Sequence, residues 1–200
     1  EEVLVLKNIK KGAMFGLDAR IALAIFGALS VISGAALYSA IANAKMTARI
    51  TNFTEIEKAV EQYYLDTSLL PPVSTTNSVN DLSAYALVEK PSGVTGWNGP
   101  YLPNEKYVSG DALVIDNNRF SLMYRESDNA SSICTKSSAN CSVFIWHGES
   151  DHNFAKSINE FIDNEDSSAA TNYTGKIHYY ATYHTYKTNI PFEPTNSPNT

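Results

Sequence analysis

Few residues of this chain have the types and spacing that catalysis requires. The histidines are in no HExxH or Ser-His-Asp arrangement, and there is neither a P-loop nor a GxGxxG motif. His178 and His184 would share one face of a strand, but about 20 Å apart, too far to bind one metal ion together. The sequence therefore predicts that the protein is not an enzyme.

One acidic cluster has the oxygen donors that calcium prefers. Asp163, Glu165 and Asp166 lie close together, with Asn164 beside them. Their order lacks the glycine turn of a standard calcium loop, so a solvated acidic turn is the alternative. The sequence leaves calcium as a candidate ligand and indicates no other cofactor.

A single carboxylate, Asp18, lies at the edge of a long apolar segment. From Ile21 to Ala44 the chain has no Asp, Glu, Lys, Arg, His or Pro, which is enough for one membrane-spanning helix of about 20 residues. A carboxylate at such a place is costly to remove from water unless it is paired. In a packed array of helices it would pair with the amino terminus or a lysine of a neighbouring subunit and set the register. The alternative is an aspartate that faces water beside Arg20.

Two cysteines, Cys134 and Cys141, lie close together in a polar, Ser-rich stretch, with no histidine or third cysteine at zinc-binding spacing. Lysines precede the apolar segment, and this pattern predicts a cytoplasmic N-terminus and translocation of everything after Lys45. Translocation would place the cysteines in an oxidising compartment, so a disulfide is predicted. Reduced thiols in a cytosolic loop are the alternative.

The apolar segment continues without Gly or Pro into an amphipathic segment. Apolar residues recur there at helical spacing, at Ile50, Phe53, Ile56 and Val60. A single helix over residues 14–66, with its apolar half at 21–44, would be roughly 75 Å long. Its first half needs lipid or identical neighbours, whereas its second half packs on its own domain.

Small residues in the apolar half favour close packing between helices. Gly27, Ser30 and Gly34 allow two backbones to approach, and Ser30 and Gly34 form a small-xxx-small pair. Ile25 and Leu29 lie among them and are assigned to the same packing surface. A membrane anchor that is merely rich in small residues is the alternative.

Residues 67–200 are predicted to form a globular α+β head. Pro71 and Pro72 end the long helix, and the tail from Pro191 is rich in proline. The patterns predict short helices at 81–89 and 154–162, strands at 112–115, 119–125 and 142–147, and a strand or hairpin at 176–187. The predicted fold is a long N-terminal hydrophobic helix packed on a small antiparallel β-sheet head.

Two segments resemble the type IV pilin and pseudopilin superfamily. The first is Lys10-Lys11-Gly12-Ala13-Met14-Phe15-Gly16-Leu17-Asp18, which is similar to a basic leader, its cleavage site and the acid at the fifth mature position, with Asp in place of the usual Glu. Cleavage after Ala13 would make Asp18 the fifth residue, so residues 1–13 are expected to be a leader or a retained extension. The resemblance assigns Met14, Phe15 and Asp18 to assembly and register.

The second segment is Gly96-Trp97-Asn98-Gly99-Pro100-Tyr101-Leu102. It looks like the Gly-Trp-x-Gly-Pro-Tyr-Leu run that recurs in the major pseudopilins of type II secretion. The continuation expected in that family is absent, and the head is larger than a typical pseudopilin head. The resemblance also implies calcium near the C-terminal end, which favours the acidic cluster at residues 163–166.

The resemblance implies a structural role. The chain is expected to be the major pilin of a bacterial type IV pilus-like surface filament that serves adhesion or motility. It would wait in the inner membrane until the assembly machinery builds it into an extracellular helical homopolymer. A net charge of -6, with 15 basic residues against 21 acidic ones, argues against nucleic acid as the main partner. The alternatives are the major pseudopilin of a type II secretion system and a single-span membrane-anchored periplasmic binding protein.

Overall fold

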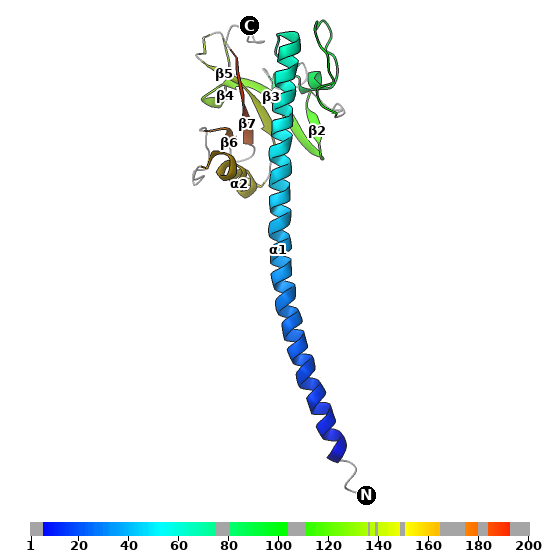
Figure 1. The fold of residues 1–200 in the computed structure, drawn as a ribbon. Coiled ribbons are helices and arrows are strands. Elements are labelled where there is room, and N and C mark those ends of the chain that lie inside the picture. Colours follow the sequence, from blue (N-terminus) through cyan, green and yellow to red (C-terminus); the bar gives the residue numbers. More distant parts are fainter. Residues whose placement is uncertain are drawn as a thin grey trace. The chain divides into compact units, whose positions relative to one another are not determined.

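The structure is a computed structural model that describes residues 6–74, 81–103, 111–135, 137–138, 140–148, 151–164, 175–179 and 184–192. Its first element is one helix, α1 (Leu6–Thr67), which contains the predicted residues 14–66 (Figure 1). The chain divides into two compact units within this helix, Glu1–Thr47 and Ala48–Thr200. We call the second the head unit.

The α1 residues of the first unit have an apolar surface with no cover. From Gly16 to Ala44 every residue is exposed. An 18-residue window of this helix has a mean hydropathy of 2.1 with none of its residues buried, so the helix is long and apolar enough to cross a membrane. An exposed apolar surface of this extent is typical of a segment that contacts lipid or another protein.

In the head unit the same helix buries one face. Phe53, Ile56, Val60 and Tyr63 are fully buried, at the spacing of three and four that the sequence predicted. Glu55, Lys58 and Gln62 lie on the opposite, exposed face. The amphipathic half of α1 therefore forms part of the head's own core.

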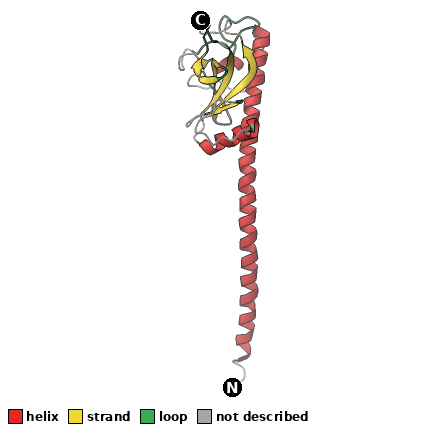
Figure 2. Cartoon of the chain, turned by 90° about the vertical axis from the view of Figure 1, so that its left-hand side faces the viewer, coloured by secondary structure: helices red, strands yellow, loops and turns green. Residues whose placement is uncertain are grey.

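The remaining elements form an antiparallel sheet with short helices (Figure 2). Within the described residues the sheet has seven strands, of which five run in the order β1-β3-β5-β7-β6, while β2 and β4 also pair with β3. The elements after α1 are β1 (Asp81–Leu82), a 3-10 helix (Ala84–Leu87), β2 (Leu113–Ile115), β3 (Asn118–Glu126), β4 (Asn129–Ile133), β5 (Cys141–His147), α2 (His152–Asp163), β6 (Ile177–Tyr179) and β7 (His184–Phe192).

The central strands follow the predictions closely. In the pairing of β3 with β5, Leu122 lies opposite Ile145 and both are fully buried. The stretch 176–187 contains β6 and the first residues of β7, which pair with Ile177 opposite Tyr186. These results confirm the predicted α+β fold, a long apolar helix with an antiparallel sheet.

The helix predicted at residues 81–89 is wrong. Asp81 and Leu82 form a short strand that pairs with β3, and only Ala84–Leu87 is helical, as a 3-10 turn. Tertiary contacts override the local preference, because the Arg125 guanidinium lies 2.8 Å from the Asp81 carboxylate and holds it at the sheet. The tail is also shorter than predicted, since β7 extends through Pro191 and Phe192.

Candidate assembly surfaces

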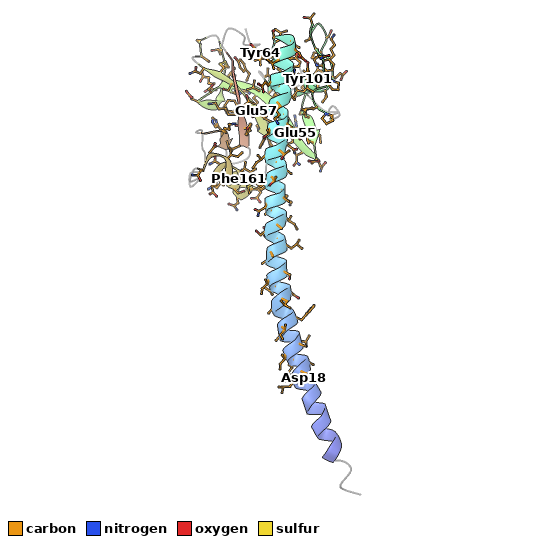
Figure 3. The ribbon with its side chains drawn as sticks, in the orientation of Figure 1. Asp18, Glu55, Glu57, Tyr64, Tyr101 and Phe161 are labelled. Atoms are coloured by element: carbon orange, nitrogen blue, oxygen red, sulfur yellow. A yellow bond between two sulfur atoms is a disulfide. The ribbon has the colours of Figure 1, made fainter. Side chains whose placement is uncertain are left out.

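The predicted register and packing residues all lie on α1. Asp18, Ile25, Leu29 and Ser30 are exposed, and Ile25 and Leu29 each expose 57% of their surface (Figure 3). Met14 and Phe15 are also helical, but their side chains lie outside the described ones. The structure thus places these residues on one continuous helix, and the partner that the sequence predicts for Asp18 belongs to another chain.

Glycines in this part of α1 lie in open space among the described residues. A Cβ added at Gly27 or Gly34 would meet nothing within 4 Å. Ser30 is satisfied locally, because its hydroxyl donates to the Phe26 carbonyl oxygen at 2.8 Å. The role of these small residues in packing between helices stays a prediction.

A buried polar group fixes α1 to the sheet of the head unit. The Tyr186 hydroxyl donates to the Glu57 carboxylate at 2.9 Å, and its ring stacks on Phe53 with centroids 5.1 Å apart. Lys176 donates to the same hydroxyl oxygen at 3.2 Å. Burial, with the adjacent Glu57 carboxylate, raises the pKa of Tyr186. The phenol therefore stays protonated and keeps donating to Glu57.

A second polar contact fixes α1 nearer to the start of the head unit. The Arg49 guanidinium is 3.0 Å from the Asn118 side-chain oxygen and 3.2 Å from His147 Nδ1, and it lies over the Phe120 ring. Sequence reasoning missed both Arg49 and Glu57. Their spacing from Phe53 is the signal that would have found them, because it places both charges on the buried face.

The Gly-Trp loop at residues 96–102 packs on the C-terminal end of α1. The Tyr101 hydroxyl donates to the Asp66 carboxylate at 2.9 Å, and the Trp97 indole donates to the Ala86 carbonyl oxygen at 2.9 Å. Gly96 has a φ of +79°, and a Cβ added there would overlap the Asp66 carbonyl oxygen. Only glycine fits this close approach, so the motif that carried the resemblance positions the end of the long helix.

The predicted disulfide is present. It joins Cys134, just after β4, to Cys141, the first residue of β5, with Cα atoms 5.9 Å apart. Both residues are buried. The bond closes the connection between β4 and β5, two strands that follow each other in the chain and both pair with β3, and it restricts that loop in the unfolded chain as well.

Asp163, the first residue of the acidic cluster at 163–166, forms hydrogen bonds within the head unit. The two Asp163 carboxylate oxygens accept the backbone N–H groups of Lys176 and Ile177, each at 2.8 Å, which ties the end of α2 to β6. Glu165 and Asp166 lie outside the described residues. The described part of the chain contains no group of three or more potential metal-binding side chains.

Comparison with known families agrees with this arrangement. The family model of the type II secretion system protein G matches residues 36–134. The match includes the amphipathic half of α1, the Gly-Trp loop and strands β1 to β4. No curated protein and no solved structure matches the chain. Together with the apolar N-terminal helix and the antiparallel sheet, this match is consistent with the type IV pilin and pseudopilin superfamily.

Proposed function

We propose that the protein is the major pseudopilin of a type II secretion system, the subunit of a short helical filament that is built from the inner membrane. The observation that carries this proposal is the match to protein G over residues 36–134. It favours the alternative considered from the sequence over the surface pilus of adhesion and motility, because the matching family is named for secretion.

Assembly is the proposed mechanism. Before assembly the apolar surface of α1 faces lipid, and in the filament it faces the same surface of neighbouring subunits. This exchange gains little from the hydrophobic effect, because lipid tails are as apolar as leucine. Close packing at Gly27, Ser30 and Gly34 then supplies the attraction between helices.

Asp18 is proposed to select the axial register of that packing. Its carboxylate lies on an exposed face of α1 just before the apolar residues. A carboxylate that enters an apolar filament core is stable only with a positive partner, which here is an amino terminus or a lysine of an adjacent subunit. Only those axial displacements between neighbouring α1 helices that bring Asp18 to its positive partner are then stable.

Two substitutions test this role, one that conserves the volume of the side chain and one that conserves its charge. Asp18→Asn removes the charge with almost no change in volume, and Asp18→Glu keeps the charge. We expect both variants to insert into the membrane, and we expect only Asp18→Glu to retain filaments in electron micrographs of cells that overproduce the secretion machinery. Normal filaments of Asp18→Asn would contradict the register role.

A gene deletion separates secretion from a surface pilus. Loss of the subunit should abolish release of exported proteins into the medium, and the wild-type gene should restore it. If export is unchanged and surface filaments disappear instead, the protein is a pilin and the secretion assignment is wrong.

A further inference from the structure

The sheet of the head unit ends on one side at β6, and within the described residues no further strand pairs with it. The Lys187 N–H donates to the Lys176 carbonyl oxygen at 2.7 Å, in register with the pairing of β6 with β7. Peptide groups of an antiparallel strand point alternately toward its partner and away from it. Those of Ile177 and Tyr179 therefore point away from β7, to the outer edge of the sheet.

Two side chains of α2 satisfy the outward peptide groups of Ile177. Asp163 accepts the Ile177 N–H at 2.8 Å. The Asn159 amide, oriented by its hydrogen-bond partners, donates to the Ile177 carbonyl oxygen at 3.0 Å and lies 3.3 Å from the Asp163 carboxylate. Asn159 and Asp163 are four residues apart and so lie on one face of α2. Together they supply the donor and the acceptor that a neighbouring strand would supply.

The rest of α2 holds these side chains at the edge of β6 (Figure 1). The Asp151 carboxylate caps the start of the helix by accepting two backbone N–H groups of its first turn. Ala155 and Ile158 are buried, and Asn159 is fully buried. A buried amide is costly unless it forms hydrogen bonds. Asn159 therefore fits this position for its hydrogen-bonding groups, which an apolar side chain of similar volume lacks.

On the other side of the contact, Gly175 lets the chain before β6 approach Asp163. Its φ is +75°, and a Cβ added there would overlap the Asp163 carboxylate. Lys176, the next residue, donates its N–H to the second oxygen of Asp163 at 2.8 Å. Both oxygens of the carboxylate are thus bound to the backbone at the edge of the sheet.

We propose that α2 closes the edge of β6 to strand addition, and that Asn159 and Asp163 are the residues that do so. This inference rests on the proposed role as a filament subunit, in which many identical heads lie close together. Open strand edges pair readily with one another, which leads to unwanted association. With this edge closed, subunits associate through α1 and not through their sheets.

The strand that an open β6 would accept is β6 of a second copy. Two identical edges can pair antiparallel about a two-fold axis, so the contact is self-complementary and closes a dimer. In that dimer each Ile177 would give its outward N–H and carbonyl oxygen to the other copy instead of to α2. Such a dimer competes with the helical arrangement of a filament.

The test removes the two side chains from the full chain in detergent micelles. The main variant is Asn159→Ala with Asp163→Ala, and Asp163→Ala alone is a milder variant that keeps the Asn159 contact. The matched control is Glu160→Ala, which removes one negative charge at an exposed position of the same helix. Light scattering after size exclusion gives the mass of the particle, and hydrogen exchange resolved by residue gives the protection of the Ile177 and His178 amides.

We expect the wild type and the control to be monomers with a protected Ile177 N–H. The double variant should form a dimer at the same concentration, and Asp163→Ala should form it more weakly. When the double variant is diluted to monomer, the Ile177 N–H should lose its protection and the His178 N–H, which faces β7, should keep it. Adding Tyr179→Pro should abolish the dimer, because proline removes an outward N–H and leaves the pairing with β7 intact.

A double variant that keeps the wild-type circular dichroism spectrum and stays monomeric would overturn the proposal. Association that Tyr179→Pro does not reverse would also overturn it, because strand addition at this edge needs that N–H. If the double variant loses its β-sheet signal, Asp163→Ala decides in the same way. A wild-type subunit that forms no filament would overturn the proposed function, whereas the measurements in micelles would still decide whether α2 closes the edge.

Discussion

Replacement of Gly96 by alanine tests how the Gly-Trp loop is held against α1. Gly96 has a φ of +79° and approaches the backbone of Asp66 so closely that a Cβ would overlap its carbonyl oxygen. Gly93, in the same loop region, has a φ of +77°, but a Cβ added there would meet nothing within 4 Å. The two positions share the backbone conformation and differ in the contact.

The expected losses in the free energy of unfolding follow from this difference in contact. Alanine in a left-handed conformation costs about 1 kcal/mol, and this is the whole expected cost of Gly93→Ala. At Gly96 the overlap adds about 2 kcal/mol, because backbone atoms cannot rotate away as a side chain does. If the loop separates from α1 instead, the Tyr101–Asp66 and Trp97–Ala86 hydrogen bonds are lost, at about 1 kcal/mol each. In either case Gly96→Ala is expected to lower the free energy of unfolding by about 3 kcal/mol.

The assay is thermal or urea unfolding of the full chain in detergent micelles, followed by circular dichroism and tryptophan fluorescence. A loss of 1 kcal/mol lowers the melting temperature by about 3 °C for a unit of this size. We therefore expect decreases of about 3 °C for Gly93→Ala and about 9 °C for Gly96→Ala. Equal decreases for the two variants would refute the close contact between the loop and the end of α1.

Three further predictions concern the head unit. Replacement of Cys134 and Cys141 by serine removes the disulfide and should lower the free energy of unfolding by on the order of 2.5 kcal/mol, as measured by urea unfolding against the oxidised wild type; an unchanged midpoint would contradict a stabilising role. Burial, and next Lys187, lower the pKa of His178, so the unfolded chain binds a proton first as the pH falls below about 6.5. The melting temperature should therefore decrease from pH 7 to pH 5, and His178→Asn should flatten that decrease; an identical slope would show that His178 does not contribute. Because Asp163 already accepts two backbone N–H groups, we expect a chelator to leave the melting temperature unchanged, whereas a decrease that added calcium reverses would assign the acidic cluster to calcium.

The long helix could be predicted from the sequence because its signals are local. The charge-free run at 21–44 predicts a helix that is apolar on all sides, the apolar spacing from Ile50 to Val60 predicts a helix with one apolar face, and the structure contains both in α1. The strands near 119–125 and 142–147 were also predictable, because β-branched and aromatic residues are dense there.

The errors lie where distant residues decide the local structure. Residues 81–89 contain good helix formers, yet Asp81 joins the sheet through Arg125, which is 44 residues away in sequence. Strand β4, with the polar sequence of Asn129–Ile133, gives no alternating apolar pattern and was not predicted. Its pairing depends on β3 and on the disulfide that follows it.

The candidate assembly residues could be selected from the sequence for the same reason. Asp18, Gly27 and Gly34 could be selected because they interrupt an apolar pattern, which is visible in the sequence alone. The buried hydrogen bond between Glu57 and Tyr186 joins residues 129 positions apart, and no spacing rule connects them.

In the proposed filament, α1 holds the subunits together. Cryo-electron microscopy with helical reconstruction of filaments released from cells that overproduce the chain tests it most directly, together with mass spectrometry of the subunit's N-terminus. We expect a core of α1 helices in which residues 21–44 contact identical neighbours, with Asp18 near a positive group of an adjacent subunit. A chain that stays monomeric in the membrane fraction, or filaments whose core excludes residues 21–44, would contradict it.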